Sequence, residues 1–278
     1  MTDFEEAQLR HGLRAGAIPL SYRIKTALGI TPAIYGDPIP IDKRRKGFDL
    51  SHWNSTVNHQ TAVNAGIQFG YFRATLGTTY PDDQYSNNRT NAGNRYPWGS
   101  YHALTTAAGS SQAQWFWSKA KDNPGKLPLL LDAEIIMAAS IIKSCVLQLY
   151  TLTGGQYPLI YTSAYKWSLI TDDPVNSNKT WISNHCPLIV AHWGTDSPIL
   201  PPGWATYAVH QYSADNNGLG VTYGAPPPPA ADADMDLDRT SAGWLGQFLP
   251  PSDIESRVTA LEGRMTDLEQ RVTNLETG

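Results

Sequence analysis

The stretch Leu127-Pro-Leu-Leu-Leu-Asp-Ala-Glu134 decides how the fold of this chain is interpreted. Its apolar residues stand close together and are followed by two carboxylates one residue apart. This order predicts a buried strand with acids at its C-terminal end. Side chains at positions i and i+2 leave a strand on the same side, so Asp132 and Glu134 are expected to point into one space.

Two carboxylates held this close repel each other, so one of them tends to keep its proton near neutral pH. A protonated acid beside an ionised one is the pair that glycoside hydrolysis requires. The alternative is that Asp132 and Glu134 are solvated residues that close a strand. Taken alone, the Asp-x-Glu pattern favours this alternative, so the rest of the chain has to decide.

Strand and helix patterns alternate along the central part of the chain. Helical patterns cover 58–65, 112–121 and 141–149. Strand patterns cover 47–53, 69–75, 98–102, 127–134, 158–161, 188–193 and 207–212. Such alternation predicts parallel strands joined by crossovers, hence an α/β sheet or barrel with its catalytic groups at the C-terminal strand ends. Asp49 lies at such an end. After a proline-rich insertion, a final strand over 235–238 is expected to place Asp236 and Asp238 on one face.

Composition limits the remaining choices. The 278 residues, 17% of them charged, are enough for one large core with appendages. A net charge of −4 gives no general attraction to nucleic acid. We find no signal-peptide core and no apolar run of membrane-spanning length, so neither export by this route nor membrane insertion is expected.

The cysteines and the acidic run give no sign of a metal or cofactor. Cys145 and Cys186 match no metal spacing; one disulfide is possible, and two buried thiols are favoured. Asp232, Asp234, Asp236 and Asp238 lack the glycine and distal glutamate of a calcium-binding loop. We therefore expect no metal and no cofactor.

Eight short blocks, taken in order, resemble the family 25 glycoside hydrolases, the lysozyme-type muramidases of bacteriophages and bacteria. The blocks are Phe48-Asp-Leu-Ser-His-Trp-Asn54, Phe72-Arg-Ala-Thr75, Gly99-Ser-Tyr-His102, Leu130-Leu-Asp-Ala-Glu134, Ile160-Tyr-Thr-Ser163, Ala191-His-Trp193, His210-Gln-Tyr-Ser213 and Met235-Asp-Leu-Asp238. Three positions depart from the family's usual residues: Leu76 stands where Glu is common, Ala103 where Phe is frequent, and His210 where Trp is frequent. These departures affect the expected shape of the cleft more than the chemistry, because all four acidic positions are present.

The resemblance implies a flattened, TIM-like β/α barrel that cleaves the β-1,4 bond between N-acetylmuramic acid and N-acetylglucosamine in peptidoglycan. It implies that Glu134 is the general acid, with a pKa raised by burial near Asp132, and that Asp132, Asp49 and Asp236 surround the sugar. Attack by a carboxylate and attack by the substrate's own acetamide are both open, and both retain configuration. The candidate sugar contacts are Tyr101, Tyr161, Trp193 and Gln211; for each, packing in the core is an equal alternative.

Segments on either side of the barrel have a different character. Residues 1–46 predict an N-terminal docking arm, 47–248 the barrel, and 249–278 a linker and a coiled-coil helix. Apolar residues alternate at spacings of four and three from Ile254 to Leu275, which is a heptad pattern. The unit Arg-h-x-x-h-Glu, where h is apolar, occurs three times up to Glu276 and resembles the trimer-favouring motif of short parallel coiled coils. β-Branched residues with leucine in the seam would by themselves favour dimers, so the repeated unit decides for a homotrimer through Ile254–Glu276.

These parts together lead to one main hypothesis and two alternatives. The main hypothesis is a muramidase of a phage virion, in the tail or baseplate, that acts on the bacterial cell wall and contacts other tail proteins through residues 1–46. The first alternative is a structural tail protein whose barrel only binds glycan. The second is a soluble endolysin that lyses the host.

Overall fold

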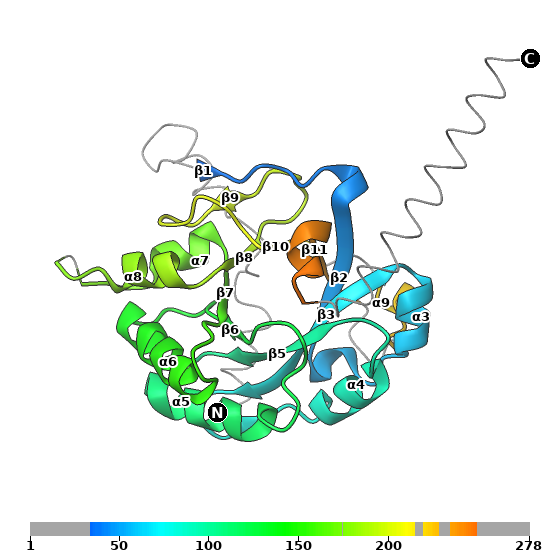
Figure 1. Ribbon diagram of the computed structural model, residues 1–278, viewed down its shortest axis with the longest axis horizontal. Coiled ribbons are helices and arrows are strands. Elements are labelled where there is room, and N and C mark those ends of the chain that lie inside the picture. Colours follow the sequence, from blue (N-terminus) through cyan, green and yellow to red (C-terminus); the bar gives the residue numbers. More distant parts are fainter. Residues whose placement is uncertain (1–33, 174, 215–218, 228–233, 249–278) are drawn as a thin grey trace, which may run out of the picture.

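Eight strands close into a barrel at the centre of the fold (Figure 1). The structure is a computed structural model that describes residues 34–173, 175–214, 219–227 and 234–248. The strands, in their order around the barrel, are β2 (Arg44–Leu50), β11 (Asp236–Ser241), β10 (Val209–Ser213), β8 (Leu188–Ala191), β7 (Leu159–Thr162), β6 (Leu130–Asp132), β5 (Trp98–Ala103) and β3 (Ile67–Leu76). Pairing of β3 with β2 closes the ring, and the predicted TIM-like α/β barrel is confirmed.

One strand runs against the others. All neighbouring pairs from β2 through β3, β5, β6, β7 and β8 to β10 are parallel, whereas β11 is antiparallel to both β10 and β2. The expected final strand over 235–238 is in fact longer and runs from Asp236 to Ser241. The alternation of strands and helices did not predict its reversed direction, because direction depends on which distant strands it pairs with.

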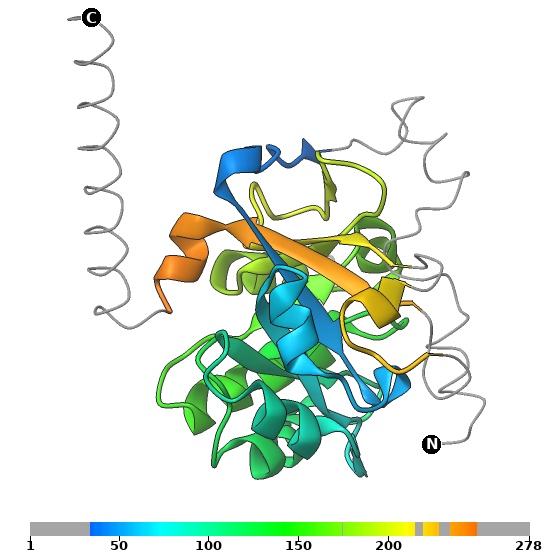
Figure 2. The same ribbon diagram turned by 90° about the vertical axis from the view of Figure 1, so that its right-hand side faces the viewer.

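Helices lie around the outside of the barrel (Figures 1 and 2). They are α3 (His59–Asn64), α4 (Tyr85–Ala92), α5 (Gly109–Ala120), α6 (Ala139–Leu152), α7 (Ala164–Leu169), α8 (Asn178–His185) and α9 (Leu219–Thr222). The short helix α10 (Ala242–Gly246) is different, because its Leu245 packs against the residues that fill the barrel. Short 3-10 turns occupy Ile41–Lys43 and His52–Asn54, and a short strand β4 (Tyr80–Pro81) pairs antiparallel with the C-terminal end of β3. None of the helices in the described ranges has the length and apolarity needed to cross a membrane.

Local sequence accounts for the helices that were predicted. In α6, Ile142, Cys145, Val146 and Leu149 recur at helical spacing, and all four are fully buried on one face. In α3, the side chain of Asn58 accepts hydrogen bonds from the backbone amides of Gln60 and Thr61, which is the usual N-cap arrangement.

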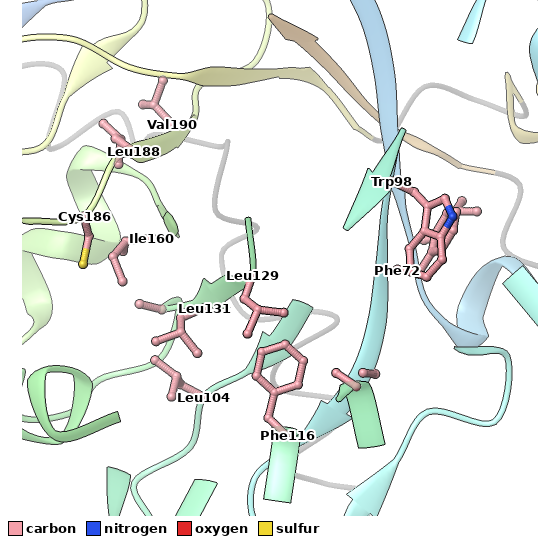
Figure 3. Close-up of a cluster of buried hydrophobic side chains, with 14 of the residues drawn as sticks. Phe72, Trp98, Leu104, Phe116, Leu129, Leu131, Ile160, Cys186, Leu188 and Val190 are labelled. Carbon is pink, nitrogen blue, oxygen red and sulfur yellow. The ribbon is translucent and has the colours of Figure 1, made fainter. Parts of the chain in front are cut away.

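The apolar core has two layers, because successive strand residues point to opposite faces. The outer layer lies between strands and helices and is drawn in part in Figure 3, where Leu131, Ile160, Leu188 and Val190 come from three neighbouring strands. The inner layer fills the barrel and consists of Phe69, Tyr71, Tyr101, Leu127, Leu130, Leu159, Ile189, Val209 and Leu245. Cys145 and Cys186 are free, buried thiols in the outer layer, as favoured from the sequence.

Two glycines make room for the large aromatic residues inside the barrel. A Cβ at Gly47 would lie 2.4 Å from the ring of Phe69, and a Cβ at Gly99 would lie 2.6 Å from the ring of Tyr71. Both distances are too short for real carbon atoms, so a side chain at either position would displace an aromatic ring of β3. The rings of Phe69 and Tyr71 therefore fit inside the barrel only because their neighbouring strands carry glycine.

The chain that precedes the barrel packs on one side of it. The strand β1 (Ile34–Tyr35) pairs antiparallel with β9 (Ile199–Leu200), and β2 begins at Arg44, three residues before the expected start of the barrel. Residues 1–33 of the predicted arm, residues 228–233 of the proline-rich insertion and the predicted coiled coil over 249–278 lie outside the described residues.

Candidate active site

The four predicted acids lie at one end of the barrel. Asp49 is the penultimate residue of β2, Asp132 is the last residue of β6, and Glu134 follows two residues later. Asp236 is the first residue of β11, which begins one residue after the strand expected over 235–238. Because β11 is antiparallel, its first residue meets the C-terminal ends of the parallel strands, and Asp236 stands directly opposite Asp49 in the register.

Tyr161 on β7 lies close to all four carboxylates. Burial raises the pKa of its hydroxyl well above the usual value, and the charges of Glu134, Asp49, Asp236 and Asp132 raise it further, in that order. The charges of all four carboxylates thus act on one hydroxyl, although the carboxylates come from three different strands and the segment after β6. The barrel therefore gathers these acids into one site.

A hydrogen-bonded chain joins three of the predicted sugar contacts to one of these acids. The hydroxyl of Tyr161 donates to Gln211 Oε1 at 2.8 Å, and the indole Nε1 of Trp193 donates to the same oxygen at 2.9 Å. The amide Nε2 of Gln211 then donates to Asp49 Oδ2 at 2.9 Å. Gln211 is almost fully buried, so its side chain orients Asp49 from within the barrel.

The carboxyl groups of Asp49 and Asp132 favour the protonated form. The pKa of Asp132 is raised well above its usual value, first by burial and then by the charges of Glu134 and Asp49. Its Oδ1 is buried and has no hydrogen-bond partner among the described residues. Burial also raises the pKa of Asp49, with a further contribution from Asp238, while the bond from Gln211 opposes the rise.

Sequence reasoning missed Arg73, which supplies positive charge beside the acids. Its side chain is 8% exposed and Nε lies 2.8 Å from Asp82 Oδ2. Its charge lowers the pKa values of both Asp49 and Asp132, against the effect of burial. The signal was available, because Arg73 continues the inward alternation of Phe69 and Tyr71 along β3.

The partners of Arg73 fix its position at the mouth of the barrel. Asp82 accepts a hydrogen bond from the backbone amide of His52 at 3.0 Å, and the guanidinium of Arg73 also contacts the ring of His52. Although burial alone would raise the pKa of Asp82, the bonds from His52 and Arg73 lower it. Asp82 is therefore an ionised anchor for Arg73.

Asp238 is a second residue whose part in the site was not predicted. It faces the barrel interior one step deeper than Asp236, is 1% exposed, and stands opposite Gln211 in the register. Burial, with Asp236 beside it, raises its pKa well above the usual value. Its Oδ1 and the hydroxyl of Tyr71 both lack hydrogen-bond partners among the described residues. The floor of the site therefore contains two buried polar atoms to which no described residue makes a hydrogen bond.

The remaining predicted contact, Tyr101, lies on the inner face of β5. It is 8% exposed and stands opposite Arg73 in the register. Burial raises the pKa of its hydroxyl, and among the charged groups that act on it are Arg73, Asp49 and Asp132. Its neighbour His102 points the other way, stacks on Phe116 of α5 and belongs to the packing between the barrel and its helices. Across the described ranges, no group of three or more His, Cys, Asp or Glu side chains has the arrangement of a metal site.

An α/β barrel with carboxylates gathered at the C-terminal ends of its parallel strands is the arrangement expected of a glycoside hydrolase. Comparison with known proteins gives the same class, because residues 48–221 match the family described as Glycosyl hydrolases family 25. The chain belongs to this family. The four acids, Tyr101, Tyr161, Trp193 and Gln211 are the positions at which the family resemblance places the site.

Relatives from bacteria and fungi are similar over the barrel. Lysozyme M1 of Streptomyces globisporus is 32% identical over 197 residues, which is 64% of this chain and 64% of that protein. An N,O-diacetylmuramidase of Chalaropsis sp is 31% identical over 189 residues, 60% of this chain and 87% of the relative. The crystal structure of the bacterial lysozyme from Streptomyces coelicolor superposes with a TM-score of 0.57 at 27% identity, covering 72% of this chain and 94% of that one.

Proposed function

We propose that this protein is an N-acetylmuramidase that cleaves the β-1,4 bond between N-acetylmuramic acid and N-acetylglucosamine in peptidoglycan. The observation that carries the proposal is the gathering of Asp49, Asp132, Glu134 and Asp236 around the hydroxyl of Tyr161. Similar proteins that bear the names lysozyme and N,O-diacetylmuramidase support the choice of substrate.

The four carboxyl groups have different proposed roles in the reaction. Glu134 lies beyond the end of β6 and is proposed to donate a proton to the leaving oxygen. Asp132 and Glu134 repel each other, so the pair holds a proton more readily than either acid alone. Asp49 and Asp236 lie opposite each other on adjacent strands and, with Asp132, are proposed to surround the sugar, where one of the three in its ionised form stabilises positive charge at the anomeric carbon. Attack by a carboxylate or by the acetamide of the substrate leads to retention of configuration.

Identification of the new reducing ends tests this proposal. Purified protein is incubated with peptidoglycan, the products are reduced, and the reduced sugars are identified by mass spectrometry. Reduced N-acetylmuramic acid at the new ends is the expected result, and Glu134→Gln protein serves as the matched control. Reduced N-acetylglucosamine would show a different glycosidase. Binding of glycan without any new reducing end would favour the alternative of a glycan-binding structural protein.

We also propose that the protein is part of a phage virion, in the tail or baseplate, and acts there on the bacterial cell wall. The heptad pattern from Ile254 to Leu275 and its three Arg/Glu units support a homotrimer, and residues 1–46 suit docking on other tail proteins. A soluble endolysin shares the chemistry and is the competing role. Immunodetection of the protein in purified particles separates the two, since an endolysin is expected only in the lysate.

A further inference from the structure

The crossover between β8 and β10 differs from the other crossovers beside the site because it contains no helix. Residues 192–208 include only the short strand β9. Trp193, which lies in this segment, donates to Gln211, the residue that orients Asp49. A connection without a helix depends more on outside contacts for its position. The contacts that hold residues 192–196 therefore affect the position of Trp193 beside Gln211 at the candidate site.

Arg239 on β11 makes two of these contacts. Its guanidinium donates to the backbone carbonyl of Thr195 and pairs with the carboxylate of Asp196. Its side chain is 7% exposed, and the charged group also lies 4.9 Å from the ring centre of Tyr212. A buried guanidinium that is paired on several sides fixes its partners strongly, because breaking one contact leaves a charge unpaired.

His210 on β10 also contacts both Arg239 and the segment 192–196. Its Nε2 lies 2.7 Å from the carbonyl oxygen of His192, and its Nδ1 lies 3.0 Å from the guanidinium of Arg239. Since a carbonyl only accepts and a guanidinium only donates, the ring carries its proton on Nε2 and accepts at Nδ1. Burial lowers the pKa of His210 to about 3, so the ring stays neutral and keeps both bonds at working pH.

These contacts hold the segment on both sides of Trp193. His210 binds the carbonyl of His192 just before it, and Arg239 binds the carbonyl of Thr195 two residues after it. We propose that Arg239 and His210 are positioning residues that fix residues 192–196 and thereby hold Trp193 against Gln211 at the glycan cleft. The proposal rests on the proposed function for the identity of the ligand, while the ordering of the segment is independent of it.

The network also reaches the chain that precedes the barrel. Asp196, whose side chain is 58% exposed, lies 3.0 Å from a guanidinium nitrogen of Arg44, and Arg44 in turn donates to the carbonyl of Ile39. The backbone amide of Gly36 donates to Pro198. The segment 192–198 is therefore enclosed between β11 on one side and residues 36–44 on the other.

Hydrogen exchange tests the ordering directly. The change is Arg239→Met, which keeps the length of the side chain and removes its charge and donors. The amides of His192, Gly194 and Ile199 are bonded to Gln211, Tyr212 and the ring of His192. We expect peptides covering 188–204 to exchange faster in this variant while peptides of α5 and α6 stay unchanged. Arg95→Met, the same substitution at an exposed residue, is the matched control and is expected to change neither region.

Binding and kinetics test the consequence for the site. If the competent arrangement of the segment falls to between a tenth and a fifth of the population, the apparent dissociation constant rises about 5–10-fold. We expect this rise for soluble alternating glycan strands bound to Glu134→Gln/Arg239→Met compared with Glu134→Gln alone. In the active background, KM rises by the same factor and kcat stays within about twofold, because Asp132 and Glu134 belong to β6 and the segment after it.

Two substitutions at His210 test the same proposal independently, in case the Arg239→Met variant misfolds. His210→Gln keeps one acceptor for Arg239 and one donor for the carbonyl of His192, so it is expected to behave as the wild type. His210→Phe keeps an aromatic ring and loses both bonds, so it is expected to show the exchange and affinity changes of Arg239→Met.

Unchanged exchange in 188–204 in both Arg239→Met and His210→Phe overturns the proposal. Faster exchange with unchanged glycan affinity overturns its link to the site. Failure of wild-type hydrolysis would reject the proposed function alone, because the exchange and binding measurements need no turnover.

Discussion

Burial and neighbouring charges have opposing effects on the pKa values of the acids at the candidate site. Burial and mutual repulsion raise the pKa values of Asp49 and Asp132, while Arg73, held by Asp82, lowers both. Glu134 differs in position, since it lies in the segment after the strand and not within it. Burial and repulsion thus favour the protonated forms of Asp49 and Asp132, and the charge of Arg73 opposes them.

Glu134→Gln is expected to lower the rate of peptidoglycan cleavage by about 10²–10⁴-fold, because the amide keeps the size of the side chain but cannot donate a proton as an acid. Release of reducing ends measures the rate, and thermal unfolding measures the fold. The unfolding midpoint should stay close to that of the wild type. Near-normal turnover by this variant would end the assignment of Glu134 as the general acid.

Asp238→Asn is expected to stabilise the protein at neutral pH and to have little effect in acid. The pKa of Asp238 is raised above its ordinary value of 3.8 in the folded state, so above that pH the unfolded chain loses its proton first. Wild-type stability therefore falls as pH rises from about 4 toward the folded pKa, by about 1.4 kcal/mol for each unit of elevation. Asparagine does not titrate and avoids this loss.

Urea unfolding at pH 3.5 and pH 7 measures the effect of Asp238→Asn. The difference in free energy of unfolding between variant and wild type should be more favourable at pH 7 than at pH 3.5. Asp122→Asn, the same substitution at an exposed position, is the matched control. An equal effect of Asp238→Asn at both pH values would show that Asp238 does not titrate between them.

At the scale of single elements, β3 and β11 shape the site. β3 carries Phe69, Tyr71 and Arg73 into the barrel, and the glycines of its neighbours leave space for the two rings. β11 brings Asp236 to the mouth and Asp238 to the floor, and its outward Arg239 holds the segment that carries Trp193. Each of the two strands thus contributes some side chains to packing and others to the candidate site.

Gly99→Ala is expected to destabilise the protein by about 1–3 kcal/mol, because the added methyl group overpacks the barrel interior. Its Cβ would lie 2.6 Å from the ring of Tyr71 and 3.0 Å from Leu127. Denaturant unfolding measures the change. Gly243→Ala in α10 is the matched control: a Cβ there meets no atom within 4 Å, so its effect should be neutral or slightly stabilising. Equal stability of the two variants would contradict the packing argument.

At the scale of the whole molecule, the barrel accounts for the chemistry and the segments beyond it are proposed to determine assembly. Truncation of 253–278 is expected to leave a monomeric barrel that still cleaves soluble glycan. Three heptads span about 35 Å and are marginal as isolated helices, so neighbouring domains are expected to help hold the coil together. In the proposed coil, the Arg and Glu side chains beside the seam are expected to fix the register, and the apolar seam is expected to supply most of the association.

Light scattering on the full-length and truncated proteins measures assembly. We expect a trimeric mass for the full chain and a monomeric mass after truncation. Replacement of Leu261 and Leu268 by Asp in the full-length chain is the control for truncation, since it should also give monomers without shortening the chain. A monomer for the full chain at micromolar concentration, together with no partner in the particle, would contradict the trimer proposal.

The sequence by itself determined the class of fold, because strand and helix periods repeat every few residues. It also predicted Asp132 and Glu134 as a pair, through the eight blocks that resemble the family and not through the Asp-x-Glu pattern alone; the strand expected over 127–134 covers only Leu130–Asp132, so Glu134 lies beyond it. The capped helix α3 and the buried face of α6 follow from local patterns, as the class of fold does.

Only the tertiary structure decided how distant residues meet. The reversed direction of β11 brings Asp236 opposite Asp49, and no local pattern encodes that direction, because it depends on pairing with β10 and β2. The same holds for the bonds from Tyr161 and Trp193 to Gln211, and for the burial that raises the pKa of Asp238. Strand pairing, burial and charge coupling join residues far apart in the chain, so their consequences exist only once the barrel has closed.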